Sequence, residues 1–376
     1  MAVTIKPVQT KEEKLQFVKA QWNFYHGDKN FVPPLISDRM KILDIVKNPF
    51  YQHSKIQLWL AEDNGKIVGR IAAIINDNHL EIHNDKTGFW GFFECVNDQN
   101  AANLLFDTAA KWLKERGIEN MIGPENPSVN DEIGMLFEGV DEPPIILMTY
   151  NPKYYNDLCN NYGMTKAKDL FAYMLYPETF KTDKVTRLQG AIRERQKITL
   201  REINMKNKAQ FSKDVQTLKD IYNGAWVPNW GFVKWTDAEF DFLAADLKQV
   251  ADQRLAIIAE INGKIAGFGL ALPDFNQILI HNKKGSMLGL IWHMMTKKKK
   301  IDQCRIIALG VMPEFQKTGL DAVLYYELGV RGTEIAGFRR GEASWILEDN
   351  EMMNRGLTTT MHGEIYKKYR LYQKSI

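Results

Sequence analysis

One segment in the C-terminal part of the chain constrains the fold more than any other. Residues 305–311 read as an apolar strand, residues 312–319 as a short polar loop ending at Gly319, and residues 322–330 as a helix. The first turn of a helix carries backbone N–H groups without partners and the positive end of the helix dipole. This order therefore predicts an anion site, suited to a pyrophosphate, at the start of the helix.

The same residues also fit a strand, a turn and a helix that bind nothing, because glycine is common in turns for conformational reasons alone. Two downstream segments favour the binding interpretation. Residues 341–350 read as a strand ending at Asn350, and residues 364–372 read as a last strand. With the pattern Gln316-x-x-Gly319, this order resembles the acyl-CoA signature of the GNAT superfamily of acyltransferases, Gln/Arg-x-x-Gly-x-Gly/Ala.

The resemblance implies acetyl-CoA or another acyl-CoA as co-substrate, and it implies no metal. The chain departs from the family pattern at Asp321, which puts a carboxylate near the expected pyrophosphate. The residues that the resemblance assigns to acyl-CoA binding are Leu309, Gly310, Val311, Gln316, Lys317, Thr318, Gly319, Leu320, Asp321 and Asn350.

The chain contains the same unit twice. Residues 61–69 recur as residues 259–267, 198 positions later, and each copy has Asn-Gly between two apolar runs. Asn-Gly is a strong hairpin signal because both residues accept the positive φ of a type I′ turn. The ends of the copies also align, residues 163–173 with residues 362–372. Two domains of one fold follow.

We therefore expect an α/β (α+β) protein of two tandem GNAT-like domains, each a mixed, mostly antiparallel sheet flanked by helices. The predicted domains are residues 1–176 and residues 196–376, joined by a polar linker over residues 177–195. Only the second keeps the acyl-CoA loop. In the first, Asp98 is predicted to cap the helix over residues 99–115, where its charge would repel a phosphate.

Composition narrows the choice of partners. Lys plus Arg is 49 and Asp plus Glu is 46, so the net charge of +3 predicts no nucleic-acid partner. The basic run at residues 297–300 is interpreted as a solvated loop or helix end, with contact to a CoA phosphate or an acidic partner as the alternative. The three cysteines are far apart, and His79 and His83 have no third ligand nearby, so no metal site is predicted.

No apolar run approaches the roughly 18 to 20 residues needed to cross a bilayer. We therefore expect a cytoplasmic monomer without a membrane partner, its two repeats packing on each other. Residues 272–302 form an unusually long connection. Its apolar residues at helical spacing are interpreted as core, with a cover over a pocket as the alternative. They are Met287, Leu288, Leu290, Ile291, Met294 and Met295.

The family resemblance implies that the first helices of the second repeat and their connection border the acceptor site, so we expect the aromatic loop at residues 226–235 to line it. Aromatic walls with few polar groups suit a small-molecule cleft. Simple core packing is the alternative. The predicted substrate-binding residues are Asn229, Trp230, Phe232, Asp274 and Asn276.

The chain lacks a catalytic residue that many members of the family use. Those members have a Tyr about seven residues after an Asn that corresponds to Asn350, but position 357 here is Leu357. We therefore predict that Glu342 and Tyr366 carry the proton transfers, Glu342 sharing one strand face with Ser344. A surface carboxylate and a packed tyrosine are the alternative interpretation.

The preferred function is transfer of an acetyl or other acyl group from CoA to an amine of a small-molecule or peptide acceptor. A non-catalytic acyl-CoA-binding or protein-interaction module is the alternative. An aminoacyl-transferase taking its donor from aminoacyl-tRNA is a third hypothesis, and the near-neutral charge argues against it. The sequence does not identify the acceptor.

Overall fold

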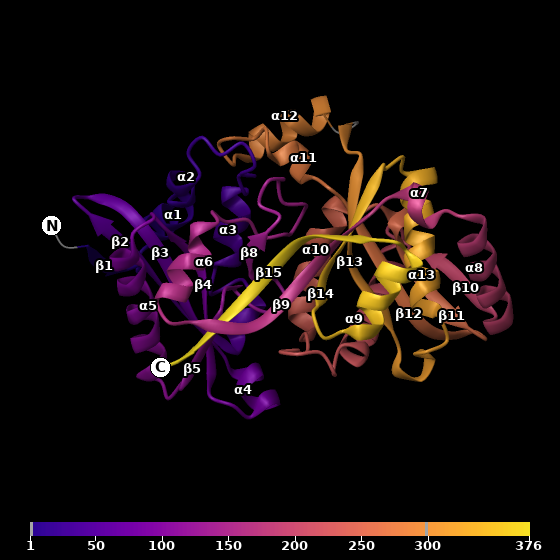
Figure 1. Cartoon of the computed structure of the whole chain (residues 1–376), viewed down its shortest axis with the longest axis horizontal. Coiled ribbons are helices and arrows are strands. Elements are labelled where there is room, and N and C mark those ends of the chain that lie inside the picture. Colours follow the sequence, from indigo (N-terminus) through magenta and orange to yellow (C-terminus); the bar gives the residue numbers. More distant parts are fainter. Residues whose placement is uncertain (1–2, 298–299) are drawn as a thin grey trace. The chain divides into compact units, whose positions relative to one another are not determined.

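A computed structural model describes residues 3–297 and 300–376 (Figure 1). The chain forms two compact units, and neither is continuous in sequence. Unit 1 comprises Met1–Asp169, Ile278–Met295 and Lys367–Ile376, and unit 2 comprises Leu170–Gln277 and Thr296–Tyr366. The predicted domains, residues 1–176 and residues 196–376, follow the two sequence repeats rather than these compact units. That division stays a prediction.

The elements that begin in the first repeat are β1 (Thr4–Pro7), α1 (Lys11–Lys19), α2 (Gln21–Phe24), α3 (Ile36–Ile42), η1 (Pro49–Gln52), β2 (Ser54–Asp63), β3 (Lys66–Asn76), α4 (Asp77–His83), β4 (Thr87–Cys95), α5 (Gln99–Lys114), β5 (Asn120–Gly123), β6 (Glu125–Asn126), β7 (Glu132–Ile133), β8 (Met135–Glu138), α6 (Tyr154–Asn161) and β9 (Thr165–Leu175).

The remaining elements are α7 (Pro177–Phe180), α8 (Asp183–Gln196), β10 (Ile198–Glu202), α9 (Lys208–Ala225), α10 (Asp237–Val250), η2 (Gln253–Leu255), β11 (Ala256–Ile261), β12 (Lys264–Pro273), α11 (Asn276–Leu279), α12 (Met287–Lys297), β13 (Gln303–Val311), η4 (Pro313–Phe315), α13 (Leu320–Val330), η5 (Arg331–Ile335), β14 (Arg340–Leu347), α14 (Glu351–Arg355), η6 (Gly356–Thr360) and β15 (Glu364–Ser375).

The sheet of unit 1 runs in the order β1-β2-β3-β4-β5-β15, with β8 also paired to β15. The β4–β5 pair is parallel, and the other pairs are antiparallel. Helix α5 buries its apolar face, including Leu105 and Phe106, against the sheet. The hairpin between β2 and β3 turns at Asn64 and Gly65, whose φ values of 50° and 72° confirm the predicted type I′ geometry.

The sheet of unit 2 runs in the order β9-β14-β13-β12-β11-β10. Its hairpin turns at Asn262 and Gly263, again with positive φ. The β13–β14 pair is parallel, and its pairing ends at Ile306 and Ala343. Helix α13 lies over this sheet and packs Leu320, Val323 and Leu324 into the core of the unit. Both sheets are therefore mixed and mostly antiparallel, as predicted.

The last strand of each repeat takes part in the sheet of the other unit. The end of β9 pairs antiparallel with β14, from Leu170 to Leu175, in unit 2. The end of β15 pairs antiparallel with β5, from Tyr372 to Ser375, in unit 1. The aligned repeat ends at residues 163–173 and 362–372 did not predict this exchange.

The structure adds local detail to two segments and corrects one expectation. Helix α7 and most of helix α8 lie within the predicted linker over residues 177–195. His79 and His83 lie on helix α4, and their ring centroids are 4.4 Å apart. Helix α12 was interpreted as core, but it buries none of its residues. Apolar spacing predicts a helix correctly, but burial also needs a partner surface.

A fragment of residues 1–176 should aggregate or melt well below the intact chain, because it lacks the strand over residues 367–376 that completes the sheet of unit 1. That strand brings Tyr372 into the core, where its hydroxyl donates to Asn156 at 3.0 Å. Thermal melting with light scattering measures the effect. Fusing residues 367–376 to the fragment through a Gly-Ser linker should restore solubility, and a well-behaved unfused fragment would contradict the prediction.

Candidate functional site

The glycine loop at the start of α13 has the backbone geometry that an anion site needs. Strand β13 leads into the short helix η4, and the chain then turns through Lys317 and Gly319, at φ 64° and 85°. Gly319 is the N-cap of α13, and no side chain caps the helix there. The first backbone N–H groups of α13 are therefore not taken by a capping side chain.

The corresponding helix of unit 1 is capped differently. The Asp98 carboxylate accepts the backbone N–H of Ala101 at 3.1 Å at the start of α5. The predicted N-cap is thus confirmed. A carboxylate at this position occupies a donor and adds negative charge where a pyrophosphate would need positive potential.

The predicted acyl-CoA residues divide between the loop and the core. Gln316 and Lys317 are exposed, Asp321 is partly exposed in the first turn of α13, and the Thr318 hydroxyl donates to the Phe315 carbonyl at 2.7 Å. Leu309 and Leu320 face the core, and Val311 packs against it. Their side chains hold β13 against α13, which leaves only their backbone to meet a ligand.

Gly310 marks the other face of β13. A Cβ atom there would lie 2.5 Å from the indole of Trp226, so only glycine allows this close approach. Trp226 stacks on Tyr222, with ring centroids 4.3 Å apart. Trp226, at the end of α9, therefore lies directly against the strand that the family resemblance assigns to acyl-CoA binding.

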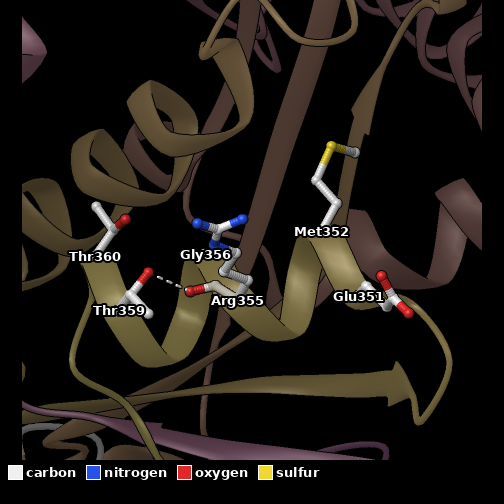
Figure 2. Close-up of a pocket in the computed structure, with 6 residues that line it drawn as sticks. All are labelled: Glu351, Met352, Arg355, Gly356, Thr359 and Thr360. Atoms are coloured by element: carbon white, nitrogen blue, oxygen red, sulfur yellow. Dashed lines mark hydrogen bonds between the residues drawn. The ribbon is translucent and has the colours of Figure 1, made fainter.

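Asn350 lies at the start of α14, where its side-chain oxygen accepts the backbone N–H of Met353 at 3.2 Å. Next to it, a surface hollow of about 490 Å³ is lined by α14 and η6 (Figure 2). Its lining residues are Glu351, Met352, Arg355, Gly356, Thr359 and Thr360. None of the predicted binding residues lines it, so it does not coincide with the glycine loop.

The two predicted proton-transfer residues are in direct contact. The Tyr366 hydroxyl, on β15, donates to Oε2 of Glu342, on β14. Oε1 of Glu342 accepts the Ser344 hydroxyl at 2.5 Å, which confirms that Glu342 and Ser344 share one strand face. Glu342 is fully buried, whereas Tyr366 is partly exposed. Tyr366 is therefore the end of this pair that a substrate can reach.

Arg305 completes this cluster, and the sequence analysis did not identify it. It lies opposite Glu342 in the β13–β14 register, with Nε 3.7 Å from Oε1 of Glu342 and 2.9 Å from the Ser344 hydroxyl. Its guanidinium lies 4.8 Å from the ring of Trp345. An arginine inside an apolar strand was the available signal, because a buried cation requires an anionic partner.

The predicted substrate residues do not all lie in one place. Phe232 is buried and its ring lies 5.9 Å from that of Tyr222, while Asn229 and Trp230 are partly exposed in the same loop. Asp274 is buried instead beside β13, accepting from the Gln303 side chain at 2.6 Å. It also accepts the backbone N–H of Asn276, the first residue of α11, so its side chain binds the start of that helix.

Unit 1 has a buried ion pair where unit 2 has Gly310. Phe268 faces Gly310 across β12 and β13, and its counterpart Arg70 faces Glu94 across β3 and β4. Arg70 and Glu94 lie 3.3 Å apart, and Tyr155 donates to Glu94 at 2.8 Å. A polar network therefore occupies this position in unit 1, where unit 2 has a glycine covered by the indole of Trp226.

Across the described ranges, no group of three or more His, Cys, Asp or Glu side chains is arranged to hold a metal ion. No helix within residues 3–297 or 300–376 combines the length and apolar character needed to cross a bilayer.

Comparison with known proteins identifies relatives of this chain and solved structures with a similar fold. No family model matches it. It is 34% identical over 387 aligned residues to the bacterial ceramide synthase of Caulobacter vibrioides, covering 100% of this chain and 98% of that protein. It is 32% identical to the protein YghO of Escherichia coli, covering 99% and 95%. Among solved structures, a tandem GNAT protein from the clavulanic acid biosynthesis pathway matches 100% of this chain and 98% of its own, with a TM-score of 0.59 at 10% identity. The chain therefore belongs to the same family as the Caulobacter and Escherichia proteins, and it has a tandem GNAT fold.

Proposed function

We propose that this chain transfers a fatty acyl group from acyl-CoA to the amine of a long-chain amino alcohol, forming a ceramide-type amide. The observation that carries the acyl-CoA assignment is the start of α13, where Gly319 caps the helix without a side chain. The acceptor class rests on the full-length similarity to a protein named bacterial ceramide synthase. Acyl transfer in general is what the GNAT fold supports.

The glycine loop supplies the donor end of this site. The backbone N–H groups at the start of α13 and the exposed Lys317 would hold the pyrophosphate, and residues 298 and 299 of the basic run lie outside the described residues. The Asp321 carboxylate, in the first turn of α13, reduces the positive potential there. Since β13 and β14 stop pairing at Ile306 and Ala343, backbone N–H groups of β13 beyond that point can polarise the thioester carbonyl.

The buried cluster supplies the proton chemistry. The amine nitrogen forms a bond to the carbonyl carbon, the carbon–sulfur bond breaks, and its electron pair leaves with sulfur. The amine loses one proton and the thiolate gains one. Tyr366 is placed to donate its proton to the thiolate, the amine releases its proton to water, and a proton from solvent restores Tyr366. Glu342 holds the Tyr366 hydroxyl in position, and Arg305 offsets the charge of Glu342. The position of the usual tyrosine is unavailable for this, because Leu357 is fully buried.

Thiol release over a panel of amines tests the proposal. Fatty acyl-CoA and a sphingoid base should release free CoA and yield an amide detectable by mass, whereas acetyl-CoA with short polar amines should react poorly. Acyl-CoA binding without thiol release on any amine would favour the non-catalytic acyl-CoA-binding module.

Glu342→Gln should lower kcat at least about tenfold and leave acyl-CoA affinity nearly unchanged, since one positioned proton transfer contributes roughly 10² to 10⁴ in rate. The amide keeps the shape of the carboxylate but weakens its hold on the Tyr366 hydroxyl. Tyr366→Phe should give a loss of similar size, and the double variant should be no worse than either. The control is Glu364→Gln, an exposed carboxylate on the same strand as Tyr366. Unchanged turnover in Glu342→Gln would make the cluster structural.

A further inference from the structure

Helix α12, Met287–Lys297, exposes an apolar face that the proposed reaction does not use. None of its residues is buried. Leu288 and Met295 are each 81% exposed and Trp292 is 65% exposed. Positions three, four and seven apart lie on one side of a helix, so these three side chains form a single stripe. Large apolar side chains gathered in this way mark a surface that binds something.

Hydrogen bonds stabilise the first turn of α12 and hold the preceding loop to unit 1. The Ser286 hydroxyl accepts the backbone N–H of Gly289 at 3.1 Å, in the first turn of α12. The loop before it is held by Trp22, whose indole N–H donates to the Lys283 carbonyl at 2.7 Å, and by the Ile36 N–H, which donates to the Gly285 carbonyl at 3.0 Å. The apolar stripe is therefore presented on a supported helix.

The charged residues of the segment that contains α12 all have one sign. No Asp or Glu occurs between residues 276 and 301. Lys283 and Lys284 precede the helix and are exposed, and Lys297 closes its last turn. Lysines at both ends of an apolar stripe that contains a tryptophan match the boundary between acyl chains and anionic headgroups. A second copy of the chain fits this surface poorly, because apposing two such helices brings like charges together.

We propose that α12 docks this protein on the surface of an anionic phospholipid bilayer. The helix lies in the plane of the interface, with Leu288, Trp292 and Met295 among the upper acyl chains and the lysines at the lipid phosphates. It is too short to span a bilayer. The sequence analysis had expected no membrane partner. This inference rests on α12 alone and is independent of the proposed reaction.

A site-specific fluorescent label gives the first test. The native cysteines Cys95, Cys159 and Cys304 are all buried, so an introduced surface cysteine can be labelled selectively. Leu288→Cys and Val46→Cys are matched, with 81% and 88% exposure. With vesicles of phosphatidylglycerol and phosphatidylcholine, an environment-sensitive dye at position 288 should brighten and shift to the blue. The dye at position 46 should not respond, and neither should respond to phosphatidylcholine alone.

Vesicle sedimentation with the unlabelled protein gives the second test. The variant Leu288→Ser/Trp292→Ser/Met295→Ser should bind anionic vesicles roughly a hundredfold more weakly, since it removes most of the inserted apolar area. The matched control is Ile45→Ser/Val46→Ser/Ile335→Ser, which removes exposed apolar side chains elsewhere. Binding by the intact chain should also weaken as salt is added.

Three results would overturn the proposal. They are no vesicle binding by the intact chain, equal loss in the control variant, and equal response from both dye positions. A dimer in sedimentation equilibrium that the α12 variant dissociates, with no vesicle binding, would assign the stripe to a second copy instead. Thiol release from detergent-dispersed substrates would remain measurable in each case, so failure here and failure of the proposed reaction are distinguishable.

Discussion

Gly319→Glu should abolish measurable CoA binding, with a loss of about a hundredfold or more in affinity. A charge-assisted hydrogen bond contributes roughly 1.5 to 3 kcal/mol, and the substitution blocks at least one such bond and adds repulsion. The new carboxylate would stand at the N-cap of α13, where Asp98 stands in unit 1. Isothermal titration with CoA measures both the affinity and the stoichiometry, which should be one per chain.

Backbone strain has to be separated from blocking of the site. Gly319 has φ 85°, and a Cβ there would lie 3.3 Å from Cδ1 of Ile192, so any side chain costs some stability. Gly319→Ala carries the same strain without the charge and should lose much less affinity. Gly337→Glu puts a carboxylate at another positive-φ glycine, φ 75°, with open space around it, and should bind CoA normally. Two CoA molecules per intact chain, or equal losses in all three variants, would reject the assignment.

Arg70→Met should destabilise unit 1 by about 3 to 5 kcal/mol, the usual cost of removing one partner from a buried ion pair. Arg70 and Glu94 are 6% and 4% exposed, and Arg70 also donates to the Phe17 carbonyl at 2.7 Å. Without Arg70, the buried Glu94 carboxylate loses the cation that forms its ion pair. Hydrogen exchange of β3 and β4 in increasing urea measures the change in unit 1 itself.

The pH dependence of the stability lost in Arg70→Met shows whether the unpaired Glu94 charge causes that loss. Burial raises the pKa of Glu94 above its ordinary value even beside Arg70, and removing the cation raises that pKa further. A folded state with a raised carboxyl pKa binds the proton more tightly than the unfolded chain, so its stability falls as pH rises. The cost of Arg70→Met should therefore be largest near about pH 8 and smaller near about pH 5.

A double variant and a surface arginine serve as controls for this prediction. Arg70→Met/Glu94→Gln should recover much of the stability, since it leaves no unpaired charge. Arg116→Met, at an exposed arginine over Trp112, should change stability by no more than about 0.5 kcal/mol. A pH-independent loss that the double variant does not reduce would show that Arg70 acts through packing alone.

Local features were predictable because their cause is local. The paired Asn-Gly hairpins at residues 64–65 and 262–263 follow from the φ preferences of two residues. The helix after the glycine loop and the Asp98 cap follow from the few residues around each helix start. Glu342 and Ser344 share a face because side chains alternate along a strand. The internal repeat then extended these elements to a tandem fold.

Contacts between distant segments were beyond the sequence. The Arg305–Glu342–Tyr366 cluster joins three strands, and only the strand pairing shows that these residues meet. The exchange of β9 and β15 between the two sheets is equally hidden, because both strands carry the same pattern and either sheet could accept either one.

The sequence by itself determined the two hairpins, the glycine loop and the order of strands and helices, since backbone preference and periodicity act over a few residues. Only the tertiary structure decided which surfaces those elements cover. The apolar spacing of α12 indicated a buried face, yet Leu288 and Met295 are exposed. Burial is a property of two surfaces together, and a periodic sequence specifies only one of them.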